Sequence, residues 1–236
     1  MLDQAFDSLK SYDWGADRNL LNPIEEAVIA THDDPSARQE LESRLAGVLQ
    51  SDVSRDAKDY VCRKLMLIGS SASTPALAAL LLEADHSHMA RFALERIPAP
   101  EAAQALRDAL PRLAGVLKIG VIGSLGARRD AASVPALAAL IADADAAIAK
   151  AAADALGDIR TSEAVQALMA ARPAHAEATV AAVDAQLASA EQLLADGKKA
   201  EAIAVYKSLA GARQPKHVRL AATSGLLESA GKGTAP

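Results

Sequence analysis

The two histidines in the stretch "DHSH" are the first candidates for metal chemistry in this chain. His86 and His88 are two residues apart, and on a helix such a pair points to different faces, whereas helical metal pairs are spaced by three or four residues. The stretch comes just before an apolar helical pattern, so we expect Asp85 or Ser87 to cap that helix. The pattern therefore predicts a helix start and not a metal site.

The single cysteine, Cys62, is the candidate nucleophile of the thiol type. It lies in the middle of an apolar helix face with Leu65 and Met66, which predicts a buried packing residue. The sequence contains neither an HExxH motif nor paired cysteines at zinc-ligand spacing. We therefore predict no catalytic residue, no metal site and no cofactor, and a protein that is not an enzyme.

Three glycines of the stretch "GVIGSLG" recur at every third residue, as Gly120, Gly123 and Gly126. Their spacing differs from the dinucleotide-binding fingerprint, which follows a strand, whereas a helix is expected here. Each glycine inside a helix costs about 1 kcal/mol relative to alanine, so a compensating contact is expected. Close packing against a neighbouring helix is the favoured explanation and approach of a ligand backbone is the alternative, while Gly126 is expected to end the helix.

The elements that carry these residues are predicted to be helices throughout. Hydrophobic residues make up 51% of the 236 residues and aromatic residues only 3%, because alanine and leucine supply most of the apolar content. Both are strong helix formers, whereas strand-favouring residues are scarce. The composition therefore predicts an all-α protein that buries a large core.

Charge and the N-terminal sequence narrow the classes of partner. The formal net charge of −5 argues against a protein that grips nucleic acid phosphates with clustered Lys and Arg. No stretch approaches the roughly 18 uncharged apolar residues of a membrane span, and the N-terminal residues lack the regions of a signal peptide. One cysteine forms no internal disulfide, so the cellular compartment stays open. We predict a soluble chain with no nucleic acid, no membrane insertion and no evident small-molecule substrate.

A repeat organises most of the chain. The hexapeptide "PALAAL" occurs at Pro75–Leu80 and again at Pro135–Leu140. It belongs to a pattern in which an apolar-periodic helix, a turn and a second helix recur at intervals of 28 to 31 residues. The residues predicted to close the first helices are Gly69, Pro98, Gly126 and Gly157. Because two short helices cannot bury an apolar face alone, the hairpins are expected to stack on one another.

These repeats resemble a known family. The segments "SLGARRDAASVPALAAL" and "AAADALGDIRTSEAVQAL" are similar to HEAT-like repeats of the short bacterial type, also called PBS-lyase HEAT-like repeats, and the resemblance covers roughly residues 19–171. The segments "YDWG", "AKDYVCRKLMLIG" and "HMARFALERIP" resemble the HEAT module of larger, often exported, bacterial multidomain proteins. The resemblance implies a right-handed α-solenoid of stacked helical hairpins that acts as an interaction scaffold. A fragment of such a protein is compatible with a periplasmic or other extracytoplasmic location.

The second helices are the expected binding face, because they line the concave side of such solenoids. With Leu77, Leu80 and Leu81 directed inward, Ala79 is the outward centre of its helix. The matching positions in the next three hairpins are Ala105, Ala139 and Ala167, and the flanking charged residues are Glu101, Arg107, Asp108 and Glu163. One interpretation is a smooth protein-binding surface formed by these alanines with Arg107. The other, which we favour, is that alanine is simply an abundant helix former.

Residues 1–18 are predicted to cap the array with a short amphipathic helix. The apolar positions of this helix are Leu2, Phe6 and Leu9. Tyr12 and Trp14 follow it, and two interpretations of these aromatic residues are open: a platform that recognises a protein, or packing of the cap with Gly15 closing a turn. Packing is favoured because terminal repeats are irregular for packing reasons.

The predicted HEAT-like array spans residues 19–174, and a third region spans residues 175–236. Within the third region, the stretch 190–215 resembles a single tetratricopeptide-type (TPR-type) hairpin, although Gln186 stands where a large aromatic residue is expected. The matching positions are Gly197 at the turn, Ala202 and Tyr206 on the second helix, and Pro215 after it.

The stretch Val218–Leu227 aligns with Ile148–Gly157, the first helix of the last clear HEAT-like repeat. Its partner helix is missing, because the sequence ends in "ESAGKGTAP". Either the array was cut from or continues into a longer polypeptide, or this helix is a natural cap. The sequence leaves both explanations open.

Two classes of function are compatible with these features. The favoured class is a non-enzymatic scaffold that binds a partner protein, or a catalytic domain of the same polypeptide, along its concave face. The alternative is an enzyme subunit similar to phycobilin lyases, which would need a pocket with converging polar or thiol groups. A HEAT-like DNA repair protein is less favoured and would need a basic concave face. Residues 91–130 carry seven Lys/Arg against four Asp/Glu, so an acidic protein partner stays open.

Overall fold

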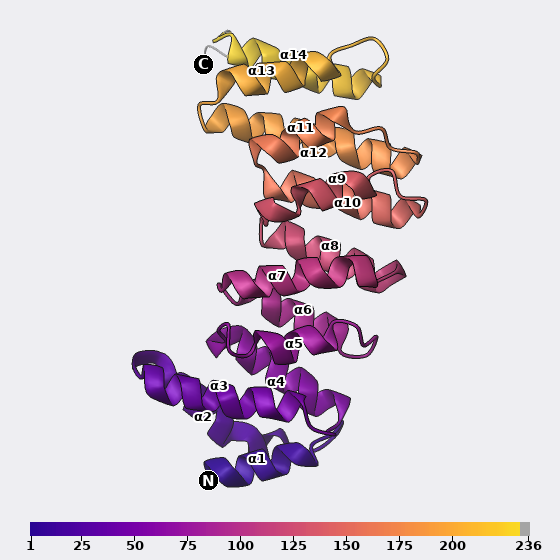
Figure 1. Ribbon diagram of the computed structural model, residues 1–236. Helices are drawn as coiled ribbons and strands as arrows, with labels where there is room; N and C mark the ends of the chain where they lie inside the picture. Colours follow the sequence, from indigo (N-terminus) through magenta and orange to yellow (C-terminus); the bar gives the residue numbers. More distant parts are fainter. Residues whose placement is uncertain (232–236) are drawn as a thin grey trace. The chain divides into compact units, whose positions relative to one another are not determined.

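The computed structural model describes residues 1–231, and every regular element in that part of the chain is helical. The chain divides into two compact units, Met1–Ser124 and Leu125–Pro236, which are considered separately. In each unit, helical hairpins pack against their neighbours along the chain (Figure 1). The prediction of an all-α fold built from stacked hairpins is therefore confirmed.

The first unit is a two-layered stack of hairpins. Helix α4 packs against α6, and α5 packs against α7, so the first helices of the hairpins form one layer and the second helices form the other. Its elements are α1 (Leu2–Lys10), η1 (Arg18–Leu21), α2 (Asn22–Ala30), η2 (Thr31–Asp33), α3 (Pro35–Leu49), α4 (Arg55–Ile68), α5 (Thr74–Leu80), α6 (Ser87–Arg96), α7 (Pro100–Ala109), η3 (Leu110–Arg112) and the start of α8 (Gly115–Ala127).

The second unit repeats the arrangement. Helix α10 packs against α12, and α9 packs against α11. Its elements after α8 are η4 (Ala131–Ser133), α9 (Val134–Leu140), α10 (Ala146–Ile159), α11 (Ser162–Ala170), α12 (Ala176–Ala195), α13 (Lys199–Leu209) and α14 (Lys216–Ser229). The two "PALAAL" copies are α5 and α9, each with its proline in the first turn, as predicted.

The N-terminal helix packs as predicted. Ala5, Phe6 and Leu9 of α1 are buried, and the guanidinium of Arg44 on α3 lies 4.0 Å from the centre of the Phe6 ring. Arg44 also forms an ion pair of 2.7 Å with Asp3. Helix α1 therefore closes one end of the core of the first unit.

A buried carboxylate on α3 sets the start of α5. Glu42 is only 3% exposed, and its oxygens accept hydrogen bonds from the backbone N–H groups of Ser70 (2.6 Å) and Ser73 (3.0 Å) and from the Ser70 hydroxyl (2.9 Å). Ser70 and Ser73 lie in the turn before α5, and Ser73, the N-cap residue, makes no side-chain cap hydrogen bond. Glu42, on the preceding hairpin, therefore supplies the hydrogen-bond acceptors for the turn that leads into α5.

Gly69 and Pro98 follow the ends of α4 and α6 as predicted, but the prediction for Gly126 and Gly157 is wrong. Helix α8 continues to Ala127 and α10 continues to Ile159, so both glycines lie inside the last turn. The backbone turns instead at two arginines with positive φ. These are Arg129 (φ 52°) and Arg160 (φ 59°).

Gly126 and Gly157 allow successive first helices to approach closely. A Cβ at Gly126 would lie 2.9 Å from the Cα of Ala155 on α10, and a Cβ at Gly157 would lie 2.8 Å from the Cβ of Ala185 on α12. Real Cβ atoms essentially never sit that close to another carbon. Close helix packing, which was expected for the interior glycines of "GVIGSLG", is thus found at Gly126, the glycine that was expected to end the helix.

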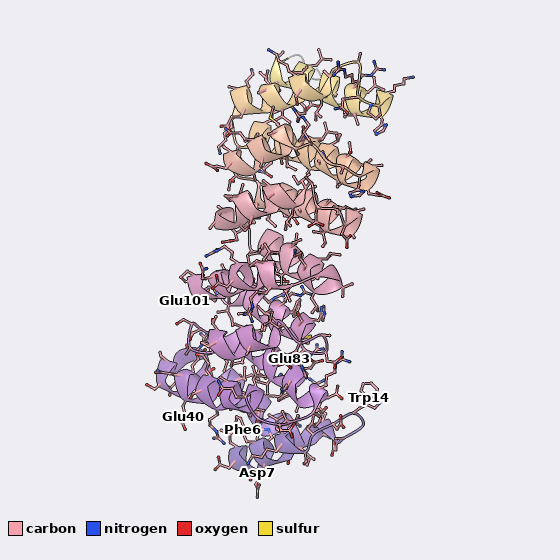
Figure 2. All side chains as sticks on the ribbon, turned by 45° about the vertical axis from the view of Figure 1, so that its right-hand side comes forward. Phe6, Asp7, Trp14, Glu40, Glu83 and Glu101 are labelled. Atoms are coloured by element: carbon pink, nitrogen blue, oxygen red, sulfur yellow. The ribbon has the colours of Figure 1, made fainter. Side chains whose placement is uncertain are left out.

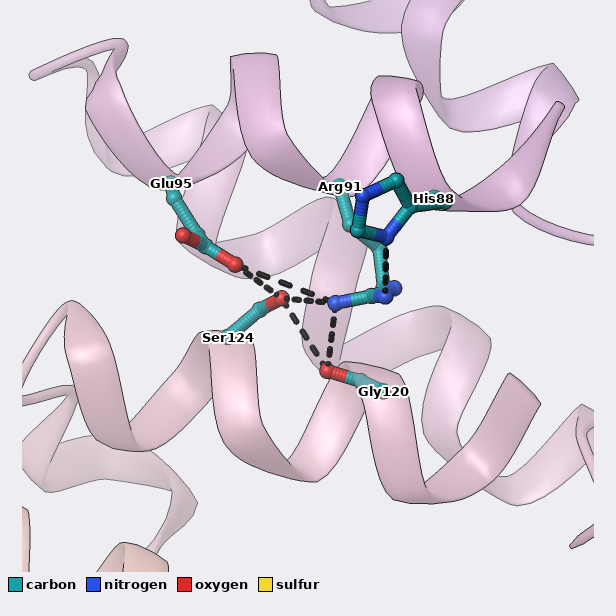
Figure 3. Close-up of polar contacts among 5 residues, drawn as sticks. All are labelled: His88, Arg91, Glu95, Gly120 and Ser124. Atoms are coloured by element: carbon teal, nitrogen blue, oxygen red, sulfur yellow. Dashed lines mark hydrogen bonds and ion pairs between the residues drawn. The ribbon is translucent and has the colours of Figure 1, made fainter. Parts of the chain in front are cut away.

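Gly120 makes room for a side chain and not for a helix backbone (Figure 3). The Arg91 guanidinium of α6 occupies the space where a Cβ of Gly120 would lie, and it donates hydrogen bonds to the Gly120 carbonyl (2.9 Å) and the Ser124 hydroxyl (3.0 Å). The Ser124 hydroxyl in turn donates to Glu95 (2.6 Å). Gly123 has open space beside it, so the packing explanation fails at that position.

We expect replacement of the fully buried Ser124 by alanine to lower the free energy of unfolding by about 1–2 kcal/mol, because Arg91 and Glu95 each lose a hydrogen-bond partner. Urea denaturation followed by circular dichroism measures this change. The matched control is Ser71→Ala, since Ser71 is exposed. Equal stability of the two variants would show that the Arg91 cluster does not stabilise the α6–α8 contact.

Helices α11 to α14 share one hydrophobic core in the second unit. Val165 of α11 belongs to the same cluster as Tyr206 of α13 and Val218 of α14, so residues on both sides of the predicted boundary at residue 174 are packed together. The predicted turn is present, because Gly197 has φ 76° between α12 and α13, and Ala202 and Tyr206 are buried. The prediction about the end of the chain concerns residues 232–236, which lie outside the described residues.

Candidate interaction surfaces

A groove between α5 and α7 runs along the second-helix face of the first unit. It has a volume of ≈ 360 Å³. Its apolar lining residues are Pro75, Ala78, Leu82, Ala105 and Ala109. Its remaining lining residues are Thr74, Glu101, Gln104, Asp108 and Arg112. The groove therefore combines small apolar side chains with exposed polar and charged ones, a combination that suits a peptide segment.

The predicted binding residues of this unit are not equivalent. Ala105 is half-buried and lines the groove, whereas Ala79 is exposed and its neighbour Ala78 takes the groove position. Arg107 is half-buried and donates a hydrogen bond of 2.7 Å to Gln104, which donates to Asp108. Arg107 thus acts on the groove through the lining residue Gln104.

The second-helix face of the second unit carries the other two predicted alanines. Ala139 on α9 is exposed and Ala167 on α11 is half-buried, and the two helices pack against each other. Glu163 at the start of α11 is exposed. The exposure pattern of the pair repeats that of Ala79 and Ala105, so each unit presents one exposed and one half-buried alanine at the predicted positions.

Comparison with known families finds a match over one segment of the chain. Residues 114–186 match the family of HEAT repeats. The match begins at the start of α8 and runs through α11 into α12, so it includes the two repeats whose sequences resemble that family most closely. No curated protein sequence matches the chain.

The HEAT-matched segment contains most of a second groove, which the sequence analysis did not predict. It lies between α10 and α12 and has a volume of ≈ 600 Å³. Its small lining residues include Gly157, Ala181 and Ala185. Its charged lining residues are Lys150, Asp154, Asp158, Arg160, Glu177 and Asp184. Gly157 and Ala185 come close together within this lining, and the alanines at helical spacing on α12 were the available sequence signal.

A third groove, of ≈ 560 Å³, lies between the loop after α1 and helix α4. Tyr12 and Trp14 line it together with Gly15 of the loop and Arg18, the first residue of η1. The predicted packing of the cap is correct for Tyr12, whose ring centre is 6.3 Å from that of Tyr60. It is wrong for Trp14, which is 90% exposed and projects away from the ribbon (Figure 2).

The candidates for catalytic chemistry occupy structural positions. Cys62 is 1% exposed, and burial raises the pKa of its thiol to about 12, so it is protonated and inaccessible near neutral pH. The prediction of a packing cysteine is therefore confirmed. Within residues 1–231, no three His, Cys, Asp or Glu side chains gather where they could hold a metal ion. In the same part of the chain, no helix is long and apolar enough to cross a membrane.

The predicted cap of α6 is wrong. His86 occupies the N-cap position without a side-chain cap hydrogen bond, and its Nδ1 lies 2.8 Å from a Glu83 oxygen. Ser87 is already the first residue of the helix and is buried, while Asp85 lies outside it. His88 contacts Arg91 at 3.2 Å (Figure 3), so the two histidines have different partners.

Proposed function

We propose that this protein is a non-enzymatic scaffold that binds a partner protein, or a catalytic domain of its own polypeptide, along the face formed by the second helices. The single observation that supports this most is the α5–α7 groove, which is lined by apolar side chains together with polar and charged ones. HEAT repeats commonly mediate protein–protein interactions, and residues 114–186 match that family. We also propose that the repeats are of the PBS-lyase HEAT-like type and that the stretch 190–215 is a TPR-type hairpin.

The chemistry of the α5–α7 groove suits a polypeptide ligand. Ala78 and Ala105 leave space for a side chain of the partner, and Leu82 adds apolar area because it is 37% exposed. Glu101, Gln104 and Asp108 in the lining offer carboxylate and amide groups to the backbone or to basic side chains of the partner. The groove offers a single basic residue, Arg112, and therefore little grip for nucleic acid phosphates.

Filling the groove tests the proposal. We expect Ala78→Leu/Ala105→Leu to retain the helical content of the native chain and to lose the proteins that the immobilised native chain retains from an extract of the source organism. The control is Ala84→Leu, because Ala84 is exposed and lies outside the groove. Equal retention by all three chains, measured by quantitative mass spectrometry, would overturn the assignment of the binding face.

A further inference from the structure

Trp14 is exposed on a loop whose backbone is held by several hydrogen bonds. The Ala16 N–H donates to the Asp13 carbonyl (3.0 Å), and Gly15 has φ 83°, so residues 13–16 form a tight turn with Trp14 at its second position. The Asp13 carboxylate accepts a hydrogen bond of 2.8 Å from the Trp14 N–H. The Ser54 hydroxyl donates to the Tyr12 carbonyl and ties the turn to the start of α4. These contacts anchor the backbone of the turn that carries the exposed Trp14.

An exposed indole on an anchored turn does not contribute to the core. Trp14 is the single tryptophan of the chain and is 90% exposed, whereas Tyr60, on the opposite wall of the groove, is 5% exposed. Tryptophan is enriched where proteins bind partners, because a rigid ring supplies a large contact area. Trp14 is therefore available to a ligand that enters the groove beside it.

The wall opposite the turn carries charges on one face of α4. Asp56, Asp59 and Arg63 follow one another at helical spacing and line the groove with Tyr60. Burial raises the pKa of Asp59, even though Arg55 and Arg63 act in the opposite direction. In the described residues, neither aspartate has a cationic side chain within ion-pair distance. A cation in this part of the groove would compensate a poorly solvated carboxylate.

Aromatic rings elsewhere in the first unit already hold cations. Arg44 lies 4.0 Å from the Phe6 ring centre, Arg96 lies 4.1 Å from that of Phe92, and Lys64 lies 4.9 Å from that of Tyr60. Trp14 has no such partner among residues 1–231, although indole is the ring that attracts cations most strongly. Within residues 1–231 the indole therefore holds no cation, and neither carboxylate across the groove lies within ion-pair distance of one, although Arg55 and Arg63 act on Asp59 from farther away.

We propose that this groove binds an arginine or lysine side chain of a partner polypeptide, with the cation over the Trp14 indole and opposite Asp56 and Asp59. Arg18 and Arg63 also line the groove. Arg18 is directed to Glu25 at 3.8 Å, whereas Arg63 is exposed. They repel a second cation and favour a carboxylate beside the first, so the preferred segment pairs one basic residue with one acidic residue.

The emission of Trp14 reports directly on this site. The probe is the blocked peptide acetyl-Gly-Arg-Gly-Glu-Gly-amide, titrated into the full chain up to about 10 mM, a range that detects weak binding. We expect saturable quenching of the indole emission. The same peptide with citrulline in place of arginine keeps the shape and removes the charge, and we expect at least about tenfold weaker binding.

Matched variants separate this site from general attraction to an acidic protein. We expect Asp59→Asn to weaken binding by about tenfold, whereas Asp196→Asn, which changes the net charge equally at an exposed position outside the three grooves, has no effect. For Trp14→Ala, which lacks the fluorophore, peptide binding is measured by the amide chemical shifts of α4. We expect this variant to lose binding while its circular dichroism spectrum stays unchanged. Absence of saturable quenching, equal binding of the citrulline peptide, or equal effects of the two aspartate variants would overturn the proposal.

Discussion

Replacement of Glu42 by alanine is expected to lower the free energy of unfolding by about 3 kcal/mol. The buried carboxylate accepts hydrogen bonds from two backbone N–H groups and one hydroxyl in the turn that leads into α5. Its removal leaves the N–H groups of Ser70 and Ser73 without that acceptor and opens a cavity beside α3. Urea denaturation followed by circular dichroism measures the change.

The same helix supplies the control for this prediction. Glu40 lies two residues earlier on α3 and is exposed (Figure 2), so Glu40→Ala should change the stability by less than about 0.5 kcal/mol. Glu42→Gln should fall between the two variants, because its amide oxygen still accepts a hydrogen bond while its NH₂ group faces donors. A loss of stability at Glu40 equal to that at Glu42 would contradict the role of Glu42 in holding α5.

A leucine at Gly126 is expected to lower the free energy of unfolding by about 3 kcal/mol, because it forces α8 away from Ala155 on α10. The identical change three residues earlier is expected to have the opposite sign. Gly123 is exposed with open space beside it, so Gly123→Leu should raise the stability by up to about 0.8 kcal/mol through helix propensity. Thermal unfolding of both variants measures the difference. Two destabilised variants would mean that the loss at Gly126 does not come from this contact.

The hairpins themselves were predictable from sequence. Apolar spacing and first-turn prolines place α4 to α11, because each helix must bury a stripe against its neighbour. The roles of Gly126 and Gly157 were not predictable in the same way. A glycine near a helix end fits a cap and a close helix contact equally well, and the contact depends on the distance to Ala155 or Ala185, which no local pattern encodes.

The candidate surfaces were predictable only in part. The outward position of Ala79 follows from the buried leucines of α5, but the neighbour that lines the groove is Ala78, because the position of α7 decides which alanine faces it. Tyr12 and Trp14 were expected to pack in the cap with Gly15 closing a turn, and the turn is present, but only Tyr12 packs, against Tyr60, whereas Trp14 is exposed. The α10–α12 groove arises from the spacing between two helices far apart in sequence. Element positions follow local rules, whereas grooves follow from tertiary packing.

Site-specific photocrosslinking tests the proposed binding face most directly. A photoreactive amino acid is placed at Ala105 in the α5–α7 groove or at the exposed Ala84 outside it, and the chain is irradiated in living cells. The scaffold proposal predicts a discrete adduct with another polypeptide from Ala105, its loss when Ala78→Leu fills the groove, and none from Ala84. Absence of an adduct from Ala105, or the same adduct from both positions, would contradict it.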